Sequence, residues 1–280
     1  LLSHSMRIFN TQTHLDSAIF IENEIDFKNS PSETEMFMRF ITSIKNGENA
    51  EFYGDLNGFH WQHRKTVKEI GIEGNYFPIT TSAFIQDNQT RLTLMTTHAQ
   101  GAASLRPGVL EVMLDRRSLY DDQRGMSEGV MDNRPMTHKF TVTVEFFNSK
   151  PDQTYQLPSL HAQHLSHALN YPVHTFYIES NDEVKNQNFK KNVELLNYQL
   201  PCDLHLVNLR TLTDPNSPLL PSKSALMIVQ RFGHDCQLLL SSYANKCLQT
   251  TGKFGNLKVF REIEVCLLYT SDAADDLLCV

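Results

Sequence analysis

The stretch "KFTVTVEFF", residues 139–147, alternates apolar and polar side chains along its length. In an extended chain Phe140 and Val142 point to one side and Thr141 and Thr143 to the other, because successive side chains face opposite sides of a sheet. A period of two over this length is typical of a strand that buries one face. The stretch therefore predicts a β-strand packed on a core.

The same strand-like pattern recurs along the chain, separated by turn signals rich in Gly, Asn and Pro. It predicts an all-β fold made of antiparallel strands packed as a β-sandwich. A single short helix is expected in "PSLHAQHLSHALN", residues 158–170, with Ser159 as its N-cap. The other expected strands lie in "SAIFIENEIDF" (17–27), "TEMFMRFITS" (34–43), "RLTLMTTHA" (91–99), "VLEVMLD" (109–115), "DLHLVNLR" (203–210) and "ALMIVQRF" (225–232).

Two β domains and a short tail are expected. The polar, proline-containing stretch "FFNSKPDQTYQLP", residues 146–158, predicts a division into residues 1–148 and 149–265. The last segment, "CLLYTSDAADDLLCV", residues 266–280, has a different pattern and looks like a translated sequencing adapter read through in frame. We expect this tail to be foreign to the gene. The start at Leu1 instead of Met indicates a fragment of a longer protein.

The composition excludes some partners. The 280 residues carry 25 Lys and Arg against 32 Asp and Glu, a formal net charge of −7, so there is no basic surface to attract nucleic acid. No apolar run reaches the roughly 18 to 20 residues that span a bilayer. The sequence leaves the oligomeric state open, a homodimer included.

Three of the five cysteines lie before the suspected tail. Cys236 and Cys247 flank a span that a β-hairpin can close, so a disulfide between them is one expectation and two buried free thiols are the other. Cys202 would then be left to pair with missing chain or to stay reduced. Asn88 begins the pattern "NQT", a glycosylation acceptor. These features favour a secretory compartment.

The acidic pair in this sequence does not indicate a catalytic dyad. Asp121 and Asp122 are neighbours in "LDRRSLYDDQRGMSEGVMDN", residues 114–133, and neighbouring residues of an extended chain point to opposite faces, so the pair cannot flank one glycosidic bond without a turn. Spacing alone leaves Arg124 either a solvated charge or a carboxylate clamp.

Three histidines in the expected helix, His161, His164 and His167, recur every third residue without a neighbouring Cys or acid that would complete a zinc site. We interpret them as a partly exposed helix face. "DLNG", residues 55–58, lacks the later ligands of a calcium loop and is predicted to be a turn. No catalytic residue and no metal ligand is therefore assigned in this chain.

Several ordered motifs resemble the C-terminal part of the α-mannosidases of glycoside hydrolase family 38. The resemblance spans most of residues 7–262, and "LPCDLHLVNLR", residues 200–210, favours the Golgi type over the lysosomal type. The remaining motifs are "LEVMLDRRSLYDDQRGMSEGVMDN" (110–133), "DLNGF" (55–59) followed by "HRK" (63–65), "GNYFP" (74–78) and "FIQDNQTRLTLMTTHAQGAASLRPG" (84–108).

This resemblance implies a retaining, zinc-dependent α-mannosidase that trims terminal α-linked mannose from N-glycans, as a type II membrane protein of the Golgi lumen. It implies that the zinc ligands, the Asp nucleophile and the acid/base carboxylate lie in an N-terminal catalytic domain absent from this chain, which alone would be inactive. The alternative is a non-catalytic β-sandwich module that binds glycans or proteins.

The resemblance also implies a role for the "DDQRG" loop, residues 121–125. Arg124 would donate hydrogen bonds to substrate, Asp121 and Asp122 would support the loop, and Gly125 would permit its turn. Arg116 and Arg117 are expected to pair with surface or interdomain acids instead. Phe77 stands where family members often carry Tyr, and the aromatic residues of "GNYFP" are expected to be core residues more than a substrate platform.

Overall fold

The computed structural model describes residues 2–11, 13–121, 123, 125, 127–147, 157–177, 201–235 and 237–238. They fall into two compact units. The first unit runs to Tyr171 and takes in the segment that begins at His234, and the second begins at Pro172. The boundary expected after residue 148 falls in a stretch outside the described residues, and the first unit continues beyond it.

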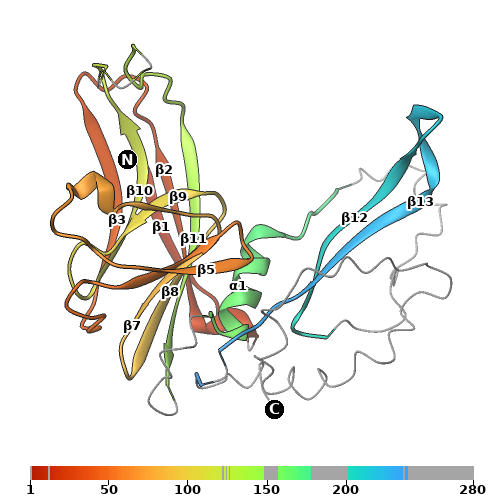
Figure 1. Ribbon diagram of the computed structural model, residues 1–280, viewed down its shortest axis with the longest axis horizontal. Helices are drawn as coiled ribbons and strands as arrows, with labels where there is room; N and C mark the ends of the chain where they lie inside the picture. Colours follow the sequence, from red (N-terminus) through yellow and green to blue (C-terminus); the bar gives the residue numbers. More distant parts are fainter. Residues whose placement is uncertain are drawn as a thin grey trace. The chain divides into compact units, whose positions relative to one another are not determined.

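Antiparallel strands make up most of the described chain, which confirms the all-β prediction (Figure 1). The first unit has a seven-stranded sheet in the order β1-β2-β11-β8-β7-β4-β5 and a four-stranded sheet in the order β3-β10-β9-β6. Two short 3-10 turns are η1 (His14–Ser17) and η2 (Ile72–Asn75). The strands are β1 (Ser3–Ile8), β2 (Ala18–Ile25), β3 (Thr34–Ile41), β4 (Phe52–Leu56), β5 (His60–Arg64), β6 (Phe77–Ile79), β7 (Ser82–Gln86), β8 (Thr90–Thr96), β9 (Gln100–Ala103), β10 (Val109–Arg117) and β11 (Met136–Phe146).

The two sheets of the first unit enclose one apolar core. Side chains from both sheets contribute to it, among them Ile21 and Leu94 of the larger sheet and Leu110 of the smaller one. Phe140 and Val142 are buried there, as the alternation in β11 predicts. Val144, on the same side of β11, is 47% exposed. We attribute the exposure of Val144 to the unequal size of the two sheets, because a four-stranded sheet cannot cover the whole inner face of a seven-stranded sheet.

Among the described residues there is one α-helix, α1 (Leu160–Asn170), which covers part of the outer face of the larger sheet (Figure 1). Ser159 caps it, because the Ser159 hydroxyl accepts a hydrogen bond from the backbone N–H of Ala162 at 2.9 Å, satisfying a donor of the first turn. Ala162 and Leu165 pack against Met95 of β8. The helix predicted in residues 158–170 is confirmed.

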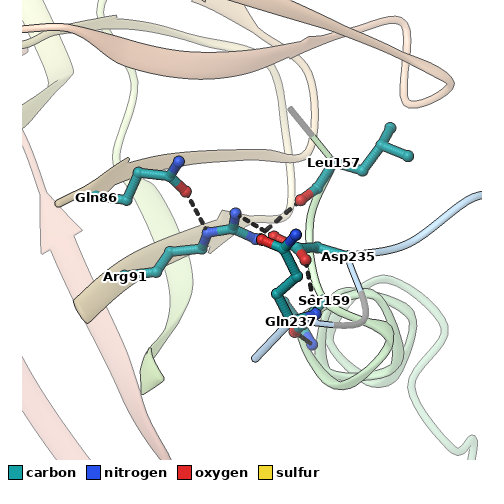
Figure 2. A network of polar contacts seen from close by, with 7 residues as sticks. Gln86, Arg91, Leu157, Ser159, Asp235 and Gln237 are labelled. Carbon is teal, nitrogen blue, oxygen red and sulfur yellow. Dashed lines mark hydrogen bonds and ion pairs between the residues drawn. The ribbon is translucent and has the colours of Figure 1, made fainter. Parts of the chain in front are cut away.

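A buried polar network joins β8 to two segments that follow β11 (Figure 2). The Arg91 guanidinium donates to Oδ2 of Asp235 at 2.7 Å and to the carbonyl of Leu157 at 2.8 Å. Its Nε donates to Oε1 of Gln86 at 2.8 Å, and the guanidinium lies 4.2 Å from the Phe84 ring centroid. Each of the three guanidinium nitrogens of Arg91 therefore donates one hydrogen bond, to an amide oxygen, a carbonyl or a carboxylate.

Glu145 of β11 lies in the same buried region and affects the charge balance there. Burial raises the pKa of the Glu145 carboxyl, while a hydrogen bond with Ser159 and the charge of Arg91 act in the opposite direction. Burial lowers the pKa of Arg91, and the charge of Asp235 opposes that shift. The side chains on this outer face of β11, Thr141, Thr143 and Glu145, are buried although they are polar.

The described part of the second unit contains a long antiparallel pair, β12 (Leu204–Asp214) and β13 (Ser217–Arg231), with register shifts along its length. Near its open end Nε of Arg231 donates to Oδ2 of Asp203 at 2.6 Å. The neighbouring Cys202 is disulfide-bonded. The other four cysteines, including Cys236 and Cys247, lie outside the described residues.

Candidate functional site

The loop between β10 and β11 carries the "DDQRG" sequence, and two described strand-like residues close its base. The backbone N–H of Ser118 donates to the carbonyl of Val130 at 3.1 Å, and the two residues form an isolated antiparallel bridge. Residues 119–129 therefore leave and re-enter the sandwich at one place. We call this segment the charged loop.

The described residues of the charged loop have turn conformations. Gly125 has a φ of +125°, and Gln123 has a φ of +60°, so the chain adopts left-handed backbone angles on both sides of position 124. Asp121 is partly buried, and its Oδ1 atom has no hydrogen-bond partner among the described residues. Asp122 and Arg124, the residues singled out in the sequence, lie outside the described residues.

The neck of the charged loop is narrow enough to require glycine. A Cβ atom built on Gly129 would lie 2.4 Å from the carbonyl oxygen of Ser118 and 2.9 Å from the carbonyl carbon of Leu119. Both atoms belong to the backbone and cannot move aside without breaking the bridge at Ser118. Gly129 therefore permits the two ends of the loop to approach each other.

Arg117, the last residue of β10, holds three backbone segments together at this neck. Its Nε donates to the carbonyl of Ser30 at 3.1 Å, and its Nη1 donates to the carbonyl of Met131 at 3.1 Å and to Oδ1 of Asn133 at 3.2 Å. Arg117 therefore donates to neutral oxygens here and not to the acid that was expected. Arg116 does meet an acid, since its Nε lies 3.2 Å from Oε1 of Glu35.

Asn133 completes this arrangement from the other side. Its Nδ2 donates to the carbonyl of Arg116 at 2.8 Å and to Oδ1 of Asp115 at 3.0 Å, while its Oδ1 accepts from Arg117. The side-chain amide of Asn133 thus donates through its NH₂ group and accepts through its oxygen, all at the end of β10. Sequence reasoning missed Arg117 and Asn133 as a pair, because the acceptors are mainly backbone carbonyls, which leave no mark in the sequence.

The aromatic residues of "GNYFP" have packing partners. Phe77 lies against the core, with its ring centroid 6.0 Å from that of Phe52, and the Arg64 guanidinium lies 4.7 Å from the Phe77 ring. The hydroxyl of Tyr76 donates to the carboxylate of Glu111. Burial, and then the bond to Glu111, raise the pKa of Tyr76. These contacts agree with the expectation of a structural role.

The three helix histidines do not form a metal site. His161 is buried, and its Nε2 lies 2.7 Å from the Ser17 hydroxyl, so the expectation of a partly exposed face is wrong for this residue. His164 and His167 are half-buried. Across the part of the chain that the structure describes, no group of three or more His, Cys, Asp or Glu side chains could hold a metal ion.

The predicted turn in "DLNG" is confirmed for Asn57 and Gly58, whereas Asp55 and Leu56 end strand β4. The aspartate holds the neighbouring connection. Asp55 of β4 is 2% exposed and accepts hydrogen bonds from the backbone N–H groups of Gly58 at 2.9 Å, Thr80 at 2.8 Å and Ser82 at 3.0 Å. It also accepts from both the N–H and the hydroxyl of Thr81. A carboxylate with this many donors serves the fold, with no sign of a calcium site.

Two remaining sequence features can be located. Asn88 is exposed in the turn between β7 and β8, where a glycan could be attached without disturbing the core. Within the described ranges, no helix is both long and apolar enough to cross a membrane.

Comparison with known proteins shows which family this chain is similar to. A model described as the glycosyl hydrolases family 38 C-terminal domain matches residues 2–124, which run from the start of β1 into the charged loop. The "Alpha-mannosidase 2" of Spodoptera frugiperda is 43% identical over 84% of this chain and 23% of that protein. The "Alpha-mannosidase 2" of Mus musculus is 32% identical over 94% of this chain and 23% of that protein.

A third relative matches a shorter part of the chain. The "Lysosomal alpha-mannosidase" of Homo sapiens is 38% identical, but over only 35% of this chain and 10% of that protein. The two "Alpha-mannosidase 2" relatives continue through the second unit. In each of those two cases the chain spans 23% of the relative's length.

Proposed function

Because the chain contains the C-terminal domain of family 38 glycosyl hydrolases, we propose that it is the C-terminal β region of an α-mannosidase that hydrolyses terminal α-linked mannose of N-glycans. The observation that carries the proposal is the 43% identity to an "Alpha-mannosidase 2" over 84% of the chain. Most of the relative's length has no counterpart here, so catalysis requires the missing N-terminal domain.

The charged loop is the part of this chain that we assign to the substrate site. Arg124 donates hydrogen bonds to sugar hydroxyls or to carboxylates beside them, for which a planar guanidinium with five donors is suited. Asp121 and Asp122 support the loop and Gly125 permits its turn. The closed neck at Ser118 and Val130 favours this role, because a loop whose ends are fixed holds its tip with less conformational freedom.

Zinc belongs to the proposed enzyme but not to this region. The described residues contain no group of side chains that fits a metal ion, so no step that uses zinc is assigned to them. We propose that the zinc ligands and both catalytic carboxylates lie in the missing N-terminal domain. The retaining reaction would then take place there, with this chain contributing a binding residue at its edge.

The proposed location is the Golgi lumen, within a type II membrane protein whose anchor lies outside this chain. The longer match to "Alpha-mannosidase 2" proteins than to the lysosomal relative supports the Golgi type. The partners are the N-glycan mannose substrate and the missing catalytic domain. A cysteine in a disulfide is consistent with an oxidising lumen.

Two experiments distinguish an enzyme region from a stand-alone glycan- or protein-binding module. Extension of the transcript upstream should give an open reading frame with a His-x-Asp zinc motif, and a start codon directly before Leu1 would favour the module. The purified chain should show no metal-stimulated hydrolysis of an aryl α-mannoside, whereas the full-length protein should. Turnover by the chain alone would contradict the assignment of catalysis to the missing domain.

A further inference from the structure

The turn between β7 and β8 carries a pattern that the proposed reaction does not use. Asn88, Gln89 and Thr90 form the acceptor pattern for N-linked glycans, and the 280-residue sequence contains no second Asn followed two places later by Ser or Thr. A pattern this short also arises by chance. Whether the folded chain can carry a glycan here therefore depends on the structure of the turn.

The turn keeps its shape without the side chain of Asn88. The backbone N–H of Asp87 donates to the carbonyl of Thr90 at 3.0 Å. Oδ1 of Asp87 accepts from the N–H groups of Gln89 at 2.8 Å and Thr90 at 2.9 Å, and its Oδ2 accepts from the N–H of Lys45 at 3.1 Å. Among the described residues none bonds to the exposed amide of Asn88. A substituent on that amide would therefore disturb none of these contacts.

The turn lies at the end of the sandwich away from the charged loop. Thr90 pairs with Phe146, the last residue of β11, whereas the loop re-enters at Val130, shortly before β11 begins at Met136. The eleven residues of β11 therefore separate the two, a length of roughly 30 Å at about 3.3 Å per residue. Figure 1 shows the hairpin of β7 and β8 at the opposite end of the first unit from the point where β10 ends.

We propose that Asn88 carries an N-linked glycan. This inference rests on the lumenal location in the proposed function, because glycan transfer to Asn occurs on secreted chains. The donor is an oligosaccharide diphospholipid, and Nδ2 of Asn88 attacks C1 of its first sugar. A C1–N bond forms and the bond from C1 to the phosphate oxygen breaks. The lipid diphosphate leaves with the electron pair, and the amide gives one proton to a base.

A glycan at Asn88 defines which end of the sandwich stays in solvent. An attached oligosaccharide is bulky and hydrated, so it needs free space around the turn. The missing N-terminal domain therefore leaves the β7–β8 turn uncovered in the whole enzyme. Because the turn lies away from the charged loop, removal of the glycan should leave turnover unchanged.

The test is mass spectrometry of the peptide that contains Asn88, from the full-length protein expressed in cultured eukaryotic cells. Treatment with a peptide N-glycosidase should release a glycan and convert Asn88 to Asp. Thr90→Ala should abolish the modification, whereas Thr90→Ser keeps the hydroxyl and should retain it. Asn88→Gln should lose the glycan and keep kcat/KM for an aryl α-mannoside within about twofold of the parent. A larger loss would contradict the placement of the glycan away from the substrate site.

A second acceptor pattern serves as the control for the compartment. Phe59→Thr creates this pattern on Asn57, which is exposed in the turn between β4 and β5. If Asn57 of that variant is glycosylated but Asn88 of the parent is not, the inference is wrong while the lumenal location stands. If neither is glycosylated, the inference and the lumenal location both fail. Hydrolysis of the aryl α-mannoside by the parent tests the proposed reaction separately.

Discussion

The guanidinium of Arg91 and the carboxylate of Asp235 lie 2.7 Å apart, 144 residues apart in sequence, and the two side chains are 0% and 1% exposed. The pair joins the larger sheet to a segment that follows the whole of β13. Two opposite charges taken out of water are stable only when they are hydrogen-bonded, and Gln86 and Leu157 accept two further hydrogen bonds from the Arg91 guanidinium.

Removal of one partner of this pair should be costly. Asp235→Ala leaves the Arg91 charge buried without its carboxylate, and we expect a loss of about 3 to 5 kcal/mol in the free energy of unfolding. Glu35→Ala breaks the exposed pair with Arg116 and should cost less than about 1 kcal/mol. Urea unfolding followed by the fluorescence of Trp61, which lies in β5, measures both. Equal losses for the two variants would mean that Asp235 does not make the predicted contribution to the free energy of unfolding.

A second stability prediction concerns Asp55. Asp55→Asn replaces one acceptor oxygen by an NH₂ group that faces backbone donors, so we expect a loss of about 2 to 3 kcal/mol. Asp26→Asn provides the comparison, because Asp26 accepts one backbone bond, from Lys28, at an exposed turn. Thermal melts of the two variants measure both losses. If Asp55→Asn costs no more than Asp26→Asn, the Asp55 carboxylate contributes no more to stability than that of an ordinary turn residue.

His138 of β11 should make stability depend on pH. Burial, and then the nearby His98, lower the pKa of His138 from 6.5 to about 4. The folded chain therefore keeps His138 neutral, while the unfolded chain takes up a proton below pH 6.5. The contribution is complete above pH 6.5 and is lost as the pH falls toward 4, and the loss of stability at pH 5 is about 2 kcal/mol relative to pH above 6.5.

Urea unfolding at pH 7, 6 and 5 checks this dependence. His138→Gln should flatten the fall in stability between pH 7 and 5, whereas the same change at the exposed His60 should leave it as in the parent. A parent chain and a His138→Gln variant with the same slope would show that His138 titrates normally.

The cysteine pairing can be resolved by peptide mapping under non-reducing conditions. Because Cys202 is disulfide-bonded, a bond between Cys236 and Cys247 would leave Cys266, Cys279 or a cysteine outside this chain as its partner. The predicted bond from Cys236 to Cys247 and a foreign tail can both hold only if Cys202 pairs with a cysteine of the longer protein outside this chain. We expect the genome to diverge after the Val265 codon and Cys202 to be linked to Cys236 or Cys247. A peptide that joins Cys202 to the tail would contradict both expectations.

The fold was predictable where a local pattern carries it. The period of two in β11 predicts its core face, and the Ser159 cap with Leu160 and Leu165 predicts α1. The other face of β11 was not predictable, because alternation assigns its polar residues to solvent. Thr141, Thr143 and Glu145 are buried instead, under a helix and a segment far away in sequence.

The candidate site was predictable in part for a similar reason. The charged loop and its glycines are visible as a sequence motif, and a turn at Gly125 follows from residue type. The neck at Gly129 and the contacts of Arg117 depend on which backbone carbonyls come close in space. Every residue except Pro has the same N–H and C=O groups, so no residue type marks those contacts in advance.

The measurement that tests the account most directly is the steady-state activity of Arg124→Ala in the full-length enzyme, with Arg116→Ala beside it. If Arg124 donates hydrogen bonds to the sugar or its neighbouring carboxylates, kcat/KM falls about 10- to 150-fold, a loss of about 1.5 to 3 kcal/mol of transition-state stabilisation. Arg116→Ala retains nearly full activity. Activity of Arg124→Ala within twofold of the parent, or equal losses for the two variants, would contradict the assignment of this loop to the substrate site.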